Sequence, residues 1–160
     1  MVIWSQGQLG VIMFNDIDVG YLAGFVDGEG TIGFRRMRCE LNKSGYKFMP
    51  VLEVYNTNYG VLLILQEKFG GIIHTKKNWH GRYKNVYMLR FKPTLQRQLL
   101  LIIEPHLIIK RIHAQLLLEY YNIIDSCGKI GTNTFHVYPK IDNIYNRLHV
   151  MNEHKPLKVA

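Results

Sequence analysis

The sequence has little cysteine, and its two cysteines lie far apart. Cys39 and Cys127 form no Cys-x-x-Cys pair among the 160 residues, which excludes a disulfide framework as the basis of the fold. The simplest interpretation is an intracellular, reducing compartment, either a prokaryotic cytoplasm or an organelle. The seven histidines show no compact spacing of the kind that ligates a metal ion.

Long apolar runs are also missing. No stretch approaches the ~20 apolar residues needed to cross a bilayer, so no membrane partner is expected. The apolar segment 1–14 lacks the basic start of a secretory signal. With 48% hydrophobic residues, the chain is expected to form one compact domain over residues 1–160. Residues 1–15 are predicted to be an irregular extension, and residues 136–160 a C-terminal helix and tail.

Positive charge is absent from the first 34 residues, which contain no Lys or Arg. The chain nevertheless carries a net charge of +8. Residues 35–47 hold five cations and residues 74–98 hold seven, so twelve of the twenty Lys and Arg lie in these two windows. Such a surplus favours a polyanionic partner, either nucleic acid or an anionic membrane surface. A generally basic, solvated surface is the alternative that composition leaves open.

Hydrophobic periodicity and turn residues predict the element order α-ββ-α-ββ-α-α-α. Asp16 or Asp18 is expected to cap the first helix. The predicted strands are 31–38, 46–55, 72–77 and 83–91, and later helices are predicted over about 61–69, 94–103, 108–124 and from 139 onward. The expected fold class is α+β, with two antiparallel hairpins in one sheet, helices on one face and the other face uncovered. Arg35 and Arg36 would put charge on both faces, which predicts a bulge or a strand end there.

The segment Leu22 to Gly30, LAGFVDGEG, is the most informative stretch of the chain. Gly20, Gly24 and Gly28 recur every four residues and therefore share one helix face. Each glycine costs up to about 1 kcal/mol relative to alanine within a helix, which indicates that another backbone packs closely there. Asp27 and Glu29 follow at the end of this stripe and offer oxygen ligands to a hard cation. The alternative is that the glycines pack inside the monomer and the acids are merely exposed.

LAGFVDGEG resembles the LAGLIDADG signature of homing endonucleases, and the similarity extends loosely over residues 16–150. In that family the signature helices pack across a two-fold or pseudo-two-fold axis, and the strands form a saddle in the DNA major groove. One motif in this chain implies a homodimer, with an interface formed by Gly20, Ala23, Gly24, Asp27 and Gly28. The resemblance implies that Glu29 binds Mg²⁺, or another divalent cation such as Mn²⁺, together with the Gly28 carbonyl. Aspartate is common at this position, and glutamate adds one methylene group.

Two further residues carry over from the family pattern. The segment 105–110 resembles the family stretch that ends in a lysine near the active site, which would be Lys110; an exposed helix lysine is the alternative. The segment 53–56 resembles the end of the second strand, which makes Asn56 the candidate for ordering water, or else a turn asparagine. Asp27 is expected to be structural. The basic residue that many relatives carry early in the second helix is missing here.

The expected activity is metal-dependent, site-specific cleavage of double-stranded DNA at a long, roughly palindromic target. An RNA-binding intron maturase and a non-cleaving DNA-binding protein are the alternatives. For each candidate DNA contact, a solvated surface residue is the competing interpretation. The candidates for DNA binding are Arg35, Arg38, Lys43, Lys47, His74, Lys76, Lys77, Arg82, Lys84 and Tyr87, of which Lys43, Lys77 and Lys84 are assigned to phosphates.

Overall fold

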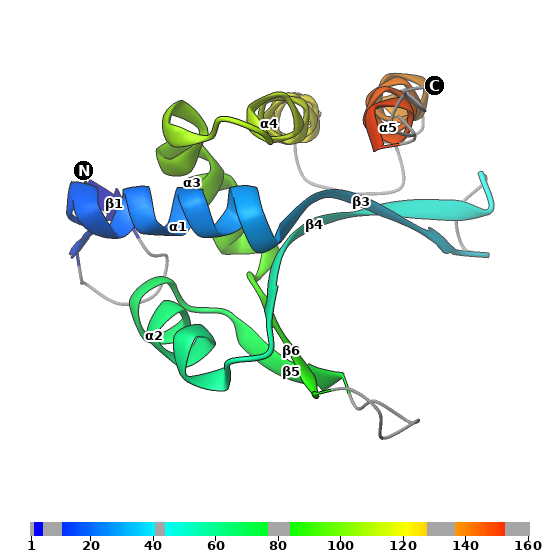
Figure 1. The fold of residues 1–160 in the computed structure, drawn as a ribbon. Helices are drawn as coiled ribbons and strands as arrows, with labels where there is room; N and C mark the ends of the chain where they lie inside the picture. The colour runs from blue at the N-terminus through cyan, green and yellow to red at the C-terminus, as the bar shows by residue number, and fades with distance from the viewer. Residues whose placement is uncertain (1, 5–10, 41–43, 77–83, 128–136, 153–160) are drawn as a thin grey trace, which may run out of the picture.

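A computed structural model describes residues 2–4, 11–40, 44–76, 84–127 and 137–152. The chain is an α+β protein whose elements follow the predicted order from Asp16 onward (Figure 1). A four-stranded antiparallel sheet has the order β3-β4-β6-β5. Its strands are β3 (Gly30–Arg38), β4 (Tyr46–Asn56), β5 (Ile72–Lys76) and β6 (Val86–Arg90). The helices are α1 (Asp16–Glu29), α2 (Tyr59–Phe69), α3 (Pro93–Ile103), η1 (Glu104–His106), α4 (Arg111–Ser126) and α5 (Tyr138–Asn152).

The first helix is capped by a residue that the sequence prediction missed. Asn15 has an extended backbone, and its side-chain oxygen accepts a hydrogen bond from the Asp18 amide at 2.7 Å. The predicted caps, Asp16 and Asp18, instead lie in the first turn, where their negative charge favours the positive end of the helix. Asparagine satisfies an otherwise unpaired amide there as well as aspartate does.

The N-terminal extension also differs from the prediction. Residues 1–15 were expected to be irregular, but β1 (Val2–Trp4) and β2 (Val11–Met13) pair antiparallel in a separate two-stranded sheet. Val2 lies opposite Met13. β-Branched and aromatic residues favour strands, and these two runs are short enough to escape a pattern that requires four or more residues.

Strand geometry defines the two faces of the sheet, and β4 is buried on both of them over Val51–Val54. Leu52 and Val54 of β4 belong to the main core, so Val51, Glu53 and Tyr55 point to the other face. The predicted bulge at Arg35 and Arg36 is wrong, since the β3–β4 register runs unbroken from Gly30↔Val54 to Arg38↔Tyr46. The helices lie on one side of the bent sheet in Figure 1. We call the opposite side the uncovered face.

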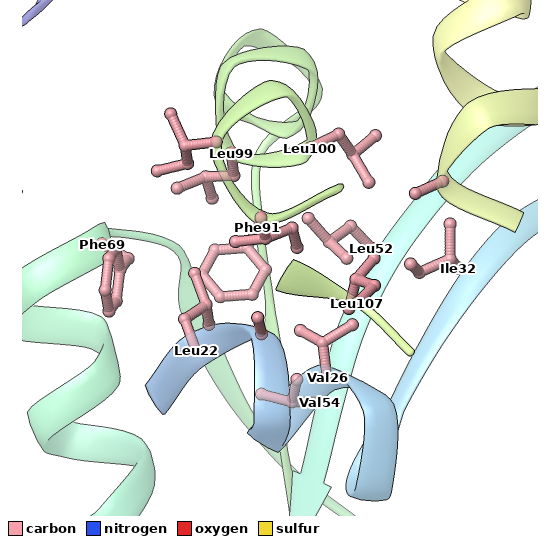
Figure 2. Close-up of a cluster of buried hydrophobic side chains, with 14 of the residues drawn as sticks. Leu22, Val26, Ile32, Leu52, Val54, Phe69, Phe91, Leu99, Leu100 and Leu107 are labelled. Carbon is pink, nitrogen blue, oxygen red and sulfur yellow. The ribbon is translucent and has the colours of Figure 1, made fainter. Parts of the chain in front are cut away.

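The core lies between α1, the sheet and α3. Figure 2 shows Leu22 and Val26 of α1 beside Leu52 and Val54 of β4, with Phe91 in the middle of the cluster. All five side chains are 0% exposed, and burying an aliphatic or aromatic side chain contributes about 1.5–3 kcal/mol each. This packing fixes the end of α1 against the sheet. Among the described residues, no helix is long and apolar enough to cross a membrane.

Candidate active site

Glu29 is the last residue of α1, at the point where the chain turns directly into β3. The turn depends on Gly30: a Cβ atom there would lie 2.5 Å from the carbonyl oxygen of Val26. Glu29 is exposed, and no described residue forms a hydrogen bond or ion pair with its carboxylate. A carboxylate at a helix C-terminus faces partial negative charge from the last carbonyl groups, so this position favours a bound cation.

Asp27 holds a distant segment of the chain against the end of α1. Its Oδ2 atom accepts hydrogen bonds from the amides of Ile108 and Ile109 at 2.6 and 3.2 Å, and its Oδ1 atom accepts one from the Lys110 amide at 2.9 Å. Burial opposes ionisation of the carboxyl, but these three amides outweigh it and lower the pKa of Asp27. The structural role expected for Asp27 is therefore played within the chain.

The side chain of Lys110 returns to the same helix end. Its Nζ donates to the carbonyl oxygens of Val26 and Asp27 at 2.9 and 2.5 Å. Burial lowers the pKa of the ammonium group, and the negative charges of Asp27 and Glu29 partly offset that effect. Lys110 thus supplies the positive charge that α1 lacks in its own last turn and stands within electrostatic reach of Glu29. We refer to the Asp27–Lys110 contacts as the α1 clamp.

The α1 clamp leads to a prediction for stability. Hydrogen bonds to a charged group contribute about 1.5–3 kcal/mol; because Asp27 is only partly buried, we expect Asp27→Asn to lower the free energy of unfolding by about 1.5 kcal/mol at neutral pH. The folded pKa lies below the ordinary value of 3.8, so this stability is present above 3.8 and is lost as the pH falls through the folded pKa. Urea denaturation at pH 7 and at about pH 3 measures both effects. Glu67→Gln, at an exposed position of α2, is the control; an equal loss at both pH values would contradict the assignment.

Asn56, the other candidate for the catalytic centre, is used locally. Its Oδ1 atom accepts a hydrogen bond from the Asn58 amide at 2.8 Å, and Asn58 in turn caps α2 through the Gly60 amide at 3.0 Å. This is the turn role that the sequence left as the alternative. A water-ordering role for Asn56 stays a prediction. Within the described parts of the chain, no group of three or more His, Cys, Asp or Glu could hold a metal ion.

The glycine stripe lies on the outside of the molecule. Gly20, Gly24 and Gly28 are exposed, and a Cβ atom on any of them would meet no atom within 4 Å. The alternative that these glycines pack inside the monomer is therefore wrong. Ile17 and Tyr21 border the stripe and are 82% and 50% exposed. One helix of this chain thus presents an uncovered surface of backbone and apolar side chains.

Two residues assigned to this interface are used elsewhere. Ala23 is 1% exposed and belongs to the main core, because it lies on the helix side that faces the sheet. Asp27 is occupied by the α1 clamp. The predicted interface did not include a second group of exposed apolar side chains. Ile108, Ile109 and Ile112 are 89%, 71% and 54% exposed. The apolar run preceding Lys110 was the available signal, and the α1 clamp places it beside the end of the glycine stripe.

The predicted DNA contacts separate between the two faces of the sheet. Strand alternation places Arg35, Lys47, His74 and Lys76 on the uncovered face. Lys84 is exposed just before β6, whereas Lys43, Lys77 and Arg82 lie outside the described residues. Tyr87 requires correction, since it packs at the edge of the main core with its ring 5.0 Å from that of Tyr59.

Arg38 also falls on the helix side. Alternation groups it with Arg36, whose guanidinium lies 3.8 Å over the Tyr46 ring. Tyr46 itself donates to Asp142 of α5. The Arg38 guanidinium is 3.2 Å from the Glu40 carboxylate, and both side chains are highly exposed. Because the strand is unbroken, the even-numbered residues of β3 point to the helix side, so Arg38 lies on the other face from Arg35. A DNA contact by Arg38 stays a prediction.

The uncovered face contains a buried acid that the sequence prediction did not use. Glu53 is 0% exposed, and its Oε2 and Oε1 atoms lie 2.6 and 2.5 Å from the guanidinium nitrogens of Arg35 and Arg90. The Tyr55 hydroxyl donates to Oε2 at 2.7 Å. Burial, followed by this hydrogen bond, raises the pKa of Tyr55. A glutamate within the apolar run Val51–Val54 was the signal that could have indicated it.

Comparisons with known proteins agree with this architecture. The profile of the LAGLIDADG endonuclease family matches residues 22–107. Among solved structures, the chain is similar to the homing endonuclease I-CvuI in complex with its target in the presence of Ca, with 22% identity over 89% of this chain and 88% of that one and a TM-score of 0.69.

Two other solved structures extend the comparison. An archaeal intron-encoded homing endonuclease complexed with DNA, I-Vdi141I, shares 21% identity over 91% of this chain and 90% of its own, with a TM-score of 0.68. The LAGLIDADG meganuclease I-AabMI, bound to uncleaved DNA, shares 18% identity with a TM-score of 0.64; 86% of this chain matches 48% of that one. No curated protein matches this chain. The family profile covers more than half of the chain and includes the Leu22–Gly30 motif, and the chain therefore belongs to the LAGLIDADG endonuclease family.

Proposed function

We propose that this protein is a site-specific, divalent-metal-dependent endonuclease that cleaves a long, roughly palindromic duplex DNA target as a homodimer. One observation carries the proposal: the exposed glycine stripe of α1 ends in an exposed carboxylate, Glu29, that forms no ion pair with any described residue. The stripe allows two backbones to approach closely. The carboxylate then stands beside the axis that relates the two copies, where two strands of DNA can be cut.

The homodimer is supported by what surrounds the stripe. Ile17 and Tyr21 on α1 and Ile108 and Ile109 at the α1 clamp are exposed apolar side chains next to it, and burying them against a second copy is favourable. This chain matches about half of I-AabMI, as expected if two copies of the fold complete one DNA-binding unit. Two identical copies favour a target with two-fold sequence symmetry.

The residues at the end of α1 fit a divalent ion such as Mg²⁺ or Mn²⁺. Carboxylate and carbonyl oxygens are the donors that hard cations prefer, and Glu29 and the Gly28 carbonyl would supply one of each. When bound, such an ion would supply Lewis-acid chemistry, polarising phosphoryl oxygens and lowering the pKa of water. One chain offers too few protein ligands for a full coordination shell, so phosphate and water oxygens, with Glu29 of a second copy, would complete it.

Lys110 acts on the same end of the helix. Its ammonium group neutralises the carbonyl end of α1 and adds positive potential beside Glu29, where phosphate charge accumulates during cleavage. The Asp27 carboxylate keeps Lys110 in place by binding its backbone amide. No basic residue lies early in α2, in the segment Asn58–Val61. Lys110 would therefore supply the positive charge beside Glu29.

DNA would bind along the uncovered face of the sheet. Arg35, Lys47, His74 and Lys76 lie there, and arginine and lysine can reach guanine O6 and N7 in the major groove. Lys84 lies outside the strands and is assigned to a phosphate. The cations on the strands would therefore read bases, and the cation outside the strands would contact the DNA backbone.

Two lysine variants test that division. Lys84→Ala should weaken binding to all sequences alike and reduce the slope of log affinity against log salt by about 0.9 for each phosphate released, hence by about twice that in a homodimer. Lys47→Ala should instead change the base preference within each half-site. Fluorescence anisotropy over a salt series and binding-site selection measure the two effects. The division is wrong if both variants change only the salt slope.

The proposed function as a whole is tested by selecting cleaved sites from a random duplex library with Mg²⁺, with EDTA as the control. We expect one cleaved family of sites with approximate two-fold symmetry and no cleavage in EDTA. Cleavage of an asymmetric target would contradict the homodimer. Protection of structured RNA without DNA cleavage would instead identify a maturase, and duplex binding without cleavage a regulator of the same fold.

A further inference from the structure

Glu53 is the only carboxylate in the described chain that is fully buried; the one other buried polar side chain is Gln96. It sits in the middle of the sheet, paired in register with Thr31 of β3 and Arg90 of β6. Both carboxylate oxygens bind a guanidinium, and Oε2 also accepts the Tyr55 hydroxyl. We call Glu53, Arg35 and Arg90 the arginine pair unit.

Stability alone does not account for this unit. A buried ion pair can often be replaced by apolar residues with little or no loss of stability, because desolvation offsets the attraction between the charges. Val51, the β4 residue next to Glu53 on the same face, is apolar and only 4% exposed, so an apolar side chain can be buried on this face. The two arginines differ from their acid in one respect: their side chains stay 39% and 35% exposed while Glu53 is covered. The carboxylate therefore fixes two cations that remain accessible on the uncovered face.

The contacts with Glu53 leave one edge of the Arg90 guanidinium available to contact a base. Glu53 engages Arg90 through Nε and Arg35 through one Nη2 contact. The two terminal nitrogens of Arg90 are not used by Glu53, and a guanidinium edge of this kind matches O6 and N7 of guanine. Because the carboxylate already orders both side chains, less conformational entropy is lost on binding. The unit carries a net charge of +1, less than two independent arginines, which favours selectivity over general attraction to phosphate.

We propose that Glu53 is a positioning residue that holds Arg35 and Arg90 as one base-reading unit, which selects guanine at one position, or two adjacent positions, of each DNA half-site. The proposal rests on the proposed function and adds the specificity determinant of the uncovered face. Glu53 itself touches no DNA. It acts by fixing the side chains of Arg35 and Arg90.

Binding-site selection on the full protein tests this directly, using random duplex DNA and no metal so that cleavage is not required. Glu53→Gln should reduce discrimination for guanine by roughly tenfold or more at the base pairs affected by Arg90→Lys and Arg35→Lys, while overall affinity for DNA is kept or increased. Arginine-to-lysine substitution keeps the charge and removes the planar fork. Gln96→Ala is the matched control: it removes the other buried polar side chain, which binds Phe91 and Tyr121 on the helix side.

The outcomes separate this inference from the proposed function. A Glu53→Gln profile identical to that of the wild type, with only a loss of stability like that of Gln96→Ala, overturns the positioning role while specific binding by the wild type upholds the function. If Glu53→Gln does not fold, Arg35→Lys and Arg90→Lys decide: loss at shared or adjacent base pairs supports the unit, and loss at separated ones or none overturns it. A wild type that selects no duplex sequence rejects both proposals.

Discussion

Glu29→Gln is expected to abolish cleavage while leaving target binding intact. Glutamine keeps the size of the side chain but cannot hold a divalent cation through a charge. In the proposed mechanism a metal ion would contribute several kcal/mol to stabilising the transition state, so the single-turnover cleavage rate should fall by about 10³-fold or more. Binding should be unchanged or slightly tighter, because each subunit presents one less negative charge to the phosphates. Paired anisotropy and single-turnover assays measure the two effects.

The control for charge is Asp16→Asn, which removes an exposed acid at the other end of the same helix. It should cut at the wild-type rate. Extra Mg²⁺ at moderate concentration should not restore Glu29→Gln, since the ligand rather than the occupancy is lost. Cleavage near the wild-type rate by Glu29→Gln would remove the metal assignment and the main support for an enzyme.

Gly24→Leu is expected to separate the dimer without unfolding the protomer. A side chain at Gly24 meets no atom of its own chain within 4 Å, and leucine favours a helix over glycine by up to about 1 kcal/mol. At a two-fold axis, however, two leucines would enter a contact shaped for bare backbone. Overpacking costs about 1–3 kcal/mol per site, so the dissociation constant of the dimer should rise by roughly 10²-fold or more. Sedimentation velocity over a concentration series measures the change.

Asn146→Leu adds the same side chain to an exposed position on α5 and should leave the assembly unchanged. The thermal unfolding of Gly24→Leu monomers shows whether the fold is kept. A wild type that sediments as a monomer both free and on DNA contradicts the homodimer. A Gly24→Leu protein that remains dimeric contradicts the placement of the interface on the glycine stripe.

The sequence predicted the arrangement of elements well because their signals are local. The Leu22–Gly30 motif, Gly70-Gly71 after α2 and Pro93 at the start of α3 each mark a boundary by their own chemistry. The face of the sheet to which each strand residue points was harder to predict. Val86, Tyr87, Met88 and Leu89 are all apolar or aromatic, so no alternation showed that Tyr87 faces the helices.

Contacts between residues far apart in the sequence could not be predicted, because no local pattern signals them. Glu53 meets Arg35 and Arg90, which are 18 and 37 residues away, and only the paired register of β3, β4 and β6 brings them together. Asp27 and the amides of 108–110 are 81 to 83 residues apart. The nine-residue motif Leu22–Gly30 was sufficient to predict the family. The contacts that support the site residues could be identified only from the structure.

The α1 clamp separates two properties that proteins often couple. Asp27 binds amides, and Lys110 binds carbonyl oxygens, so the contacts that hold the lysine beside Glu29 are made to backbone atoms of residues 26–27 and 108–110. The side chains of Ile108 and Ile109 take no part in those bonds and point outward. In the proposed homodimer, substitutions there would alter which subunits associate without displacing Lys110. A duplicated gene could thus diverge toward a selective heterodimer, reading an asymmetric site, while the chemistry of each half stays in place.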